Sequence, residues 1–157
     1  RAFAKAMDAS KIYLDEIKRS AVVCFVFLYG RLNYYAATDS AYQDKQPTYL
    51  AEADTIFAQV AVKVPDNYLG NFWRARVNSL RDPETTQGLA KPYYEAALSI
   101  LEQKPDATKS VLVECNSYLG YYYFVKEDYN QSKQYWNKIL EIDPENETAT
   151  KALGGIK

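Results

Sequence analysis

The sequence predicts an all-α protein built from repeated pairs of antiparallel helices. Apolar and aromatic residues recur at helical spacing, and no segment alternates between apolar and polar residues over the length of a strand. Small residues recur at Gly30, Ala75 and Gly120, where two helices of a pair could approach closely. One complete helix-turn-helix unit can be read directly between Asn116 and Pro144. Together these features favour an all-helical protein made of repeated helix pairs.

The unit from Asn116 to Pro144 carries a recognisable pattern. Its residues are Leu119-Gly120-x-x-Tyr123, then Ser132-x-x-x-Trp136, then Ile139-Leu140 and Pro144. This order resembles the tetratricopeptide repeat (TPR), whose signature is W-x-x-L-G-x-x-Y, then A-x-x-x-F, then P, in about 34 residues. Asn116 stands where that signature has Trp, and Ser132 stands where it has Ala. The resemblance implies a right-handed α-solenoid, and we expect this chain to be a fragment of a longer, bacterial-type TPR protein.

Two earlier segments repeat the pattern of a second helix. They are Ala53-x-x-x-Phe57, followed by Pro65, and Ala90-x-x-x-Tyr94, followed by Pro105. A third, Ala9-x-x-x-Tyr13-x-x-x-Ile17, lacks a first helix of its own. We therefore expect about three TPR-like units flanked by half units: a half unit 1–19, units 20–65, 66–105 and 106–146, and a C-terminal capping helix 147–157.

About eight helices are expected, with uncertain ends. They cover roughly residues 3–18, 20–37, 47–63, 67–81, 86–102, 107–126, 129–141 and 147–155. The polar insertion from Thr38 to Gln46 is consistent with either a helix or a loop. Asp128 and Asn146 are expected to cap the helices that follow them, and Asp82 is expected to lie in a turn that ends a helix.

Composition excludes several classes of function. The net charge is −1, from 19 basic and 20 acidic residues, so no basic excess favours nucleic acid or a membrane surface. The apolar run from Ala21 to Gly30 is too short to span a bilayer and follows a long helical segment, unlike a signal peptide. The compartment stays open: cytoplasmic, or periplasmic or cell-envelope if a signal peptide preceded Arg1.

The sequence offers no recognisable catalytic or metal site. It has no histidine and no phosphate-binding or nucleophile-elbow motif. We therefore expect a protein that is not an enzyme and that binds no cofactor and no metal. Cys24 and Cys115 are expected to be free, buried thiols rather than a disulfide or a reactive site.

The TPR resemblance implies that the first helix of each unit lines a concave groove. Carried over by register, the groove residues are Phe27, Arg31, Tyr34, Phe72, Arg76, Ser117, Tyr121 and Phe124. Phe27 with Arg31, and Phe72 with Arg76, repeat an i, i+4 pair that suits an acidic, extended peptide. In the alternative interpretation, the two arginines pair with acids of this chain and cover its apolar surface. The family's clamp for a C-terminal carboxylate needs Lys and Asn, which are absent here, so a chaperone tail is not expected.

Three functions remain open at this stage. The favoured one is a protein-protein interaction scaffold that binds a peptide or partner segment in the groove. The second is a structural or assembly module that self-associates into a homo-oligomer through its exposed ends or its tyrosine-rich surface. The third is a glycan-binding scaffold, since the 15 tyrosines could stack on sugar rings. Fold alone does not choose between them.

Overall fold

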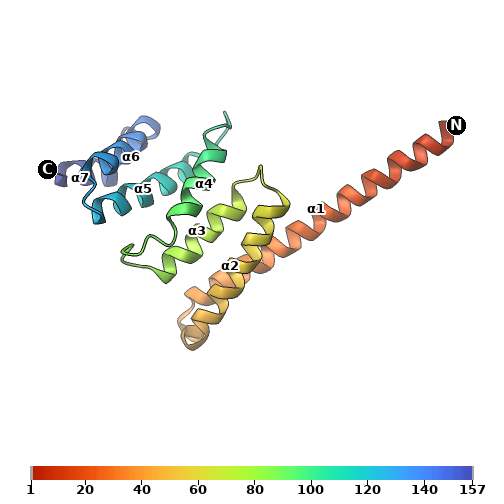
Figure 1. Ribbon diagram of the computed structural model, residues 1–157, viewed down its shortest axis with the longest axis horizontal. Coiled ribbons are helices and arrows are strands. Elements are labelled where there is room, and N and C mark those ends of the chain that lie inside the picture. The colour runs from red at the N-terminus through yellow and green to blue at the C-terminus, as the bar shows by residue number, and fades with distance from the viewer. Residues whose placement is uncertain (1, 157) are drawn as a thin grey trace.

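The protein is a stack of antiparallel helix pairs (Figure 1). The computed structural model describes the backbone of residues 2–156 and the side chains of residues 20–156. Within that range the chain forms seven α-helices, one 3₁₀-helix and no strand. They are α1 (Ala2–Thr38), η1 (Ser40–Lys45), α2 (Gln46–Lys63), α3 (Leu69–Arg81), α4 (Lys91–Leu101), α5 (Lys109–Val125), α6 (Tyr129–Ile142) and α7 (Glu147–Gly155). The predicted all-helical solenoid is confirmed.

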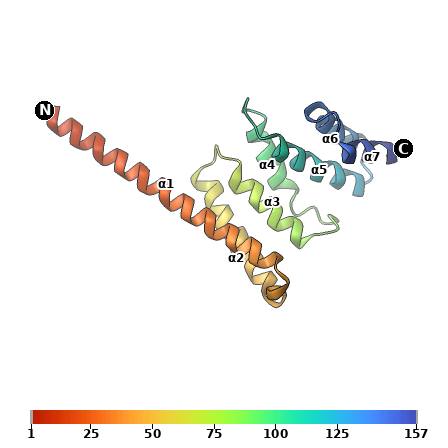
Figure 2. The ribbon, with the colours of Figure 1, turned by 180° about the vertical axis from the view of Figure 1, so that it is seen from behind.

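The N-terminal part of the prediction needs a correction. The helices expected at 3–18 and 20–37 form one continuous helix, α1, of 37 residues. The sequence between them offers no proline or glycine to interrupt the backbone hydrogen bonds. The first half of α1 extends away from the stack (Figures 1 and 2). The side chains of Ala9, Tyr13 and Ile17 lie outside the described side chains, so the half unit 1–19 stays a prediction.

The polar insertion after α1 forms the short helix η1. The Asp39 carboxylate accepts a hydrogen bond from the Ala41 N–H at 2.9 Å and so caps its start. The Gln46 side-chain amide donates to the Ala37 carbonyl at 2.9 Å, which ties the end of the insertion to the end of α1. Pro47 then lies in the first turn of α2, where a missing N–H costs nothing.

Glycines mark the closest approaches of the helices. A Cβ added at Gly30 would lie 2.8 Å from a ring carbon of Phe57, and one at Gly120 would lie 2.7 Å from the Trp136 indole. These are the crossings within a unit that the small residues predicted. At Gly120 the buried Ser132 hydroxyl also donates to the Gly120 carbonyl at 2.7 Å. A serine in the expected alanine position therefore adds a hydrogen bond between α5 and α6.

The buried apolar side chains form two clusters along the stack. The larger one joins α1 to α5 and contains Phe57, Trp73, Tyr94 and Leu101 among its members. The smaller one joins α6 and α7 around Trp136 and Ile139 and includes Ala149 and Ile156. α7 covers one side of α6 with these residues, and its capping role stays a prediction.

The helix expected from residue 86 begins only at Lys91. The preceding loop is organised by the buried Asp82 carboxylate, whose Oδ2 accepts from the N–H groups of Gln87, Gly88 and Leu89 at 3.0, 2.7 and 3.4 Å. Thr85 and Gly88 adopt positive φ angles of 57° and 72°, which no α-helix accommodates. The expected turn at Asp82 is confirmed, and it is longer than the sequence indicated.

The two predicted N-caps are confirmed. The Asp128 carboxylate accepts from the Gln131 N–H at 3.1 Å, and the Asn146 side chain accepts from the Ala149 N–H at 3.0 Å. Each satisfies an N–H group that has no partner inside its helix. These caps fix where α6 and α7 begin.

Candidate partner-binding surface

Three of the predicted groove residues meet around a tryptophan that the sequence analysis did not select. The guanidinium carbons of Arg31 and Arg76 lie 5.1 and 4.8 Å from the centroid of the Trp73 ring. Tyr34 meets the same ring edge-on at 5.3 Å. α1 and α3 therefore present two cations against one indole, a favourable cation–π arrangement. Trp73 could have been found as the residue one turn before Arg76.

Arg76 already has an acidic partner within the chain. Its Nε and Nη2 donate to the two carboxylate oxygens of Glu114 at 2.7 and 2.6 Å, a bidentate pair between α3 and α5. The Tyr94 hydroxyl also donates to Glu114 at 3.1 Å. The hydrogen bond to Glu114 raises the pKa of Arg76, and burial opposes that rise. Internal pairing, the alternative considered from the sequence, therefore describes Arg76.

Arg31 differs from Arg76 in the partners of its guanidinium group. Within residues 20–156 it forms no ion pair, and its Nη2 donates to the Tyr35 hydroxyl at 3.2 Å. Its guanidinium also lies 5.6 Å from the Tyr35 ring centroid. Its Nε is shielded from solvent with no hydrogen-bond partner in that range. Arg31 thus keeps an uncompensated charge beside aromatic rings, whereas Arg76 does not.

The surroundings of Tyr34, the tyrosine beside these arginines, raise the pKa of its hydroxyl. Burial raises the pKa of Tyr34, the Arg76 charge lowers it, and the Glu114 charge raises it. The net direction is upward, so Tyr34 stays a neutral hydroxyl at physiological pH. It can therefore offer a hydrogen bond next to the Arg31 charge.

Two predicted groove residues belong to the core. Phe72 is 4% exposed and lies beneath the Arg76 guanidinium, 4.5 Å from its ring centroid. Phe27 is half-buried and packs edge-on against Phe57 and Trp73 at 5.8 and 6.2 Å. Phe72 packs against Arg76 and Phe27 packs against Trp73, so both rings contact the Trp73 cluster from the core side.

The three predicted residues of α5 are not part of the Trp73 cluster. Ser117 is half-buried, whereas Tyr121 and Phe124 are exposed, and the Phe124 ring lies 5.9 Å from that of Tyr129. The contribution of α5 to the cluster is Glu114, one turn before Ser117. Counting from the small residue Gly120 did not indicate Glu114, because Glu114 and its partner Arg76 are 38 residues apart in the sequence.

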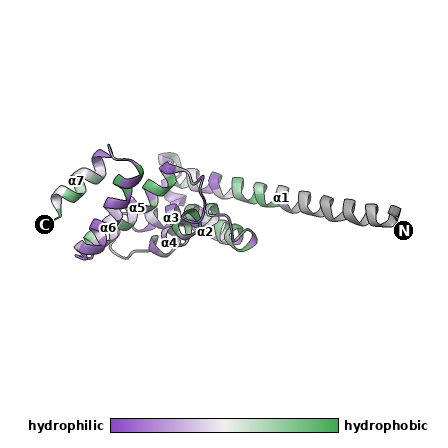
Figure 3. Ribbon diagram, turned by 90° about the horizontal axis from the view of Figure 1, so that it is seen from above, coloured by the Kyte–Doolittle hydropathy of each residue, from purple (hydrophilic) through white to green (hydrophobic). Residues whose placement is uncertain are grey.

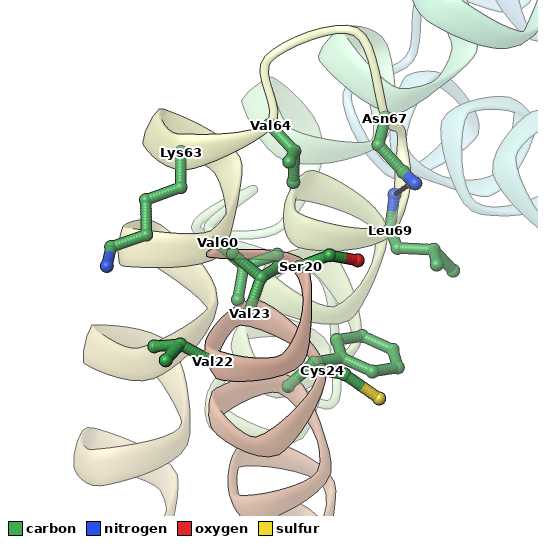
Figure 4. Close-up of a pocket in the computed structure, with 10 residues that line it drawn as sticks. Ser20, Val22, Val23, Cys24, Val60, Lys63, Val64, Asn67 and Leu69 are labelled. Atoms are coloured by element: carbon green, nitrogen blue, oxygen red, sulfur yellow. Dashed lines mark hydrogen bonds between the residues drawn. The ribbon is translucent and has the colours of Figure 1, made fainter. Parts of the chain in front are cut away.

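An open cavity lies beside this cluster (Figure 4). It has a volume of about 830 Å³ between α1, the end of α2 and the start of α3. Its lining is mostly apolar, with Val23 and Val60 among the contributors, and Phe27 is the predicted groove residue that it includes. Cys24 also lines it and is exposed, which corrects the expectation of a buried thiol; Cys115 is buried as expected.

The described residues show neither a metal-binding cluster nor a membrane-spanning helix. They contain no cluster of three or more Cys, Asp or Glu side chains arranged to hold a metal ion. None of their helices combines the length and the apolar character that a bilayer-spanning helix requires.

The comparisons with known proteins agree with the fold. No family model matches the chain, and no curated protein matches it at a significant level. The structure is similar to the crystal structure of the C-terminal part of a TPR repeat-containing protein from Cytophaga hutchinsonii, with a TM-score of 0.65 and 29% sequence identity. The match covers 94% of this chain and 69% of that chain. The chain therefore has a TPR-like helical solenoid fold, of the kind used as a protein-binding scaffold.

Proposed function

We propose that this protein is a non-catalytic scaffold that binds an extended, acidic segment of a partner protein. The segment lies across the first helices of the repeats, with Arg31 as its main charged contact. The TPR-like fold supports a protein partner in general, since solenoids of this type use extended surfaces formed by successive repeats. The acidic character of the partner rests on the residues of the Trp73 cluster.

The observation that carries the proposal is the difference between the two arginines. Glu114 neutralises Arg76 through a bidentate pair, so Arg76 has little to offer a second carboxylate. Arg31 lies against the same indole without an acidic partner in residues 20–156. A carboxylate from a partner would complete at Arg31 the pairing that Glu114 supplies at Arg76. Trp73, Tyr34 and Tyr35 would flank the bound chain.

A peptide-binding experiment tests this proposal. We expect the parent protein to select acidic peptides from a library of extended peptides that share length and apolar content but differ in charge. Arg31→Gln should weaken that binding by about tenfold or more, because it removes a charge-assisted hydrogen bond. Arg81→Gln is the matched control, since Arg81 is an exposed arginine of α3 outside the Trp73 cluster. Circular dichroism would verify that both variants fold.

The result could contradict the proposal in two ways. Equal binding of acidic peptides by the parent and by Arg31→Gln would remove Arg31 from the site. Selection of basic or uncharged peptides by the parent would show that the partner chemistry is wrong.

A further inference from the structure

A second open cavity lies between α4, α5 and α6. Its volume of about 470 Å³ is within the range of pockets that hold small molecules. Its inner wall is apolar and includes the buried Leu98 and Leu101 and the half-buried Leu112 and Ile142. Figure 3 shows hydrophobic (green) and hydrophilic (purple) turns together in the region of α5 and α6. The cavity can therefore take a molecule with an apolar body and a polar end.

Asn116 brings an unused hydrogen-bond acceptor to this cavity. It lines the cavity and is 2% exposed. Its Nδ2 donates to the Leu112 carbonyl at 2.8 Å, whereas its Oδ1 is shielded from solvent and has no hydrogen-bond partner within residues 20–156. Turning the amide over would set its oxygen against that carbonyl, so the two atoms cannot exchange roles. Folded proteins rarely leave a buried amide oxygen unpaired, so a molecule that fits here needs an N–H or O–H donor.

The repeat pattern indicates the shape of that molecule. Asn116 stands where the TPR signature has Trp, and asparagine is the smaller side chain. The space that an indole fills in a regular repeat is thus left open next to an unused acceptor. A planar bicyclic ring with an N–H group would supply both the packing and the hydrogen bond.

The outer end of the cavity is charged, with an excess of lysine. Lys104, Lys109 and Lys138 line it together with Glu102 and Glu141. Lys138 pairs with Glu102 at 3.0 Å, whereas Lys104 and Lys109 form no ion pair within residues 20–156. A ligand carboxylate at this end would be attracted by the two lysines. Both lysines are exposed, so this attraction is weaker than the contribution of the buried acceptor.

We propose that this cavity binds a small aromatic carboxylate whose ring carries an N–H donor, the chemical class of indole-3-acetate. The ring packs against Leu98 and Leu112, and its N–H donates to the Asn116 Oδ1. The carboxylate is attached on the opposite side of the five-membered ring, so it faces Lys104 and Lys109. This site uses none of the groove residues and does not depend on the proposed peptide binding.

Isothermal titration calorimetry with two ligands tests the hydrogen bond. Naphthalene-1-acetate is similar in shape to indole-3-acetate and has the same charge, but it has no N–H group. We expect indole-3-acetate to bind the parent saturably and about fivefold more tightly, because one buried hydrogen bond is lost with the other ligand. Asn116→Leu keeps a similar volume and should abolish this preference. Asn137→Leu, a change at an exposed asparagine of α6, is the matched control and should retain it.

Two further variants test the shape and the charge of the cavity. Asn116→Trp should eliminate binding, because the new side chain occupies the space of the ligand, and circular dichroism should show an intact fold. Lys104→Gln/Lys109→Gln should weaken the binding of indole-3-acetate about twofold to threefold and leave the binding of the uncharged indole-3-acetamide unchanged.

Three results would overturn the proposal. They are the absence of saturable indole-3-acetate binding by the parent up to millimolar concentration, equal affinity of the parent for the two carboxylates, and undiminished binding by a folded Asn116→Trp. Equal affinity would mean that water serves as the partner of the Asn116 Oδ1. The comparison of ligands on the parent decides the matter even if a variant at Asn116 fails to fold.

Discussion

At the residue scale, the departures from the TPR signature have structural consequences. Asn116, in the position expected for Trp, is buried; its Nδ2 donates to the Leu112 carbonyl at 2.8 Å, and its Oδ1 has no partner in the described residues. It lines a cavity of about 470 Å³ between α4, α5 and α6, which a larger side chain would reduce. Ser132, in the position expected for Ala, instead gains a buried hydrogen bond to the neighbouring helix.

The charge of the buried Asp82 carboxylate should make the stability of the fold depend on pH in acid. Burial alone would raise its pKa, but hydrogen bonds from the N–H groups of Gln87, Gly88 and Leu89 and from the Thr86 hydroxyl outweigh burial and lower it. A carboxyl whose folded pKa lies below its unfolded value stabilises the fold above the unfolded pKa of about 3.9. That stabilisation is lost as the pH falls toward the folded value.

We therefore expect Asp82→Asn to lower the free energy of unfolding by roughly 2–4 kcal/mol near neutral pH, since the loop loses an anionic acceptor. The difference between the parent and the variant should shrink as the pH falls below about 4, because the carboxyl of the unfolded parent is protonated there, and it should vanish once the folded carboxyl is protonated as well. Urea unfolding followed by circular dichroism at several pH values measures it. Glu84→Gln, a change at an exposed carboxyl in the same loop, is the control. A difference between parent and variant that is independent of pH would contradict this account.

At the element scale, the helix ends are set by local hydrogen bonds. α5 ends in a Schellman arrangement, in which the Asp128 N–H donates to the Tyr123 carbonyl at 2.9 Å and the Glu127 N–H donates to the Phe124 carbonyl at 3.0 Å. Glu127 has a φ of 61° at the position where glycine is preferred. Its side chain is exposed, so the strain has no compensating contact inside the core.

Glu127→Gly should consequently raise the free energy of unfolding by about 0.5–1 kcal/mol, because glycine adopts a positive φ without a steric penalty. Thermal unfolding of the parent and the variant would show the difference as a small increase in the melting temperature. Glu145→Gly, an exposed glutamate with no positive φ, serves as the control and should give no increase. An unchanged or lower melting temperature for Glu127→Gly would show that the left-handed backbone carries no cost here.

At the scale of the whole molecule, stability depends on how tightly neighbouring units contact each other. Each repeat in a solenoid contacts its neighbours only, so the contact between one unit and the next transmits cooperativity along the stack. Gly70 makes one such contact, because α3 meets the backbone of α2 there with no side chain between them. A side chain at this position would have to displace backbone, which a packed interior accommodates poorly.

Gly70→Ala should therefore separate α2 from α3 and reduce stability by roughly 1–3 kcal/mol, despite the better helix propensity of alanine. Hydrogen exchange should show α1 and α2 losing protection more than α6 and α7, since the damage lies at the first junction. Gly155→Ala is the matched control, because no atom lies within 4 Å of an added Cβ there. Equal loss of protection along the whole chain would mean that the units unfold as one body.

Much of the candidate site could not be read from local pattern. Arg31, Tyr34 and Arg76 were predicted from register and do meet, because repeated first helices place equivalent positions side by side. Glu114 was missed because its partner lies 38 residues away, and no local spacing encodes that pairing. Tyr121 and Phe124 were predicted from the same register but lie exposed at the far end of α5.

The sequence by itself determined the all-helical class, most helix positions, the crossings at Gly30 and Gly120, and the caps at Asp128 and Asn146. These features depend on residues a few positions apart or on one repeated pattern, so they are visible locally. Only the tertiary structure decided that α1 is continuous, and that Arg76 pairs with Glu114 while Arg31 has no acidic partner within residues 20–156. Each of these depends on which distant helices come together, and that is fixed by packing across the whole stack.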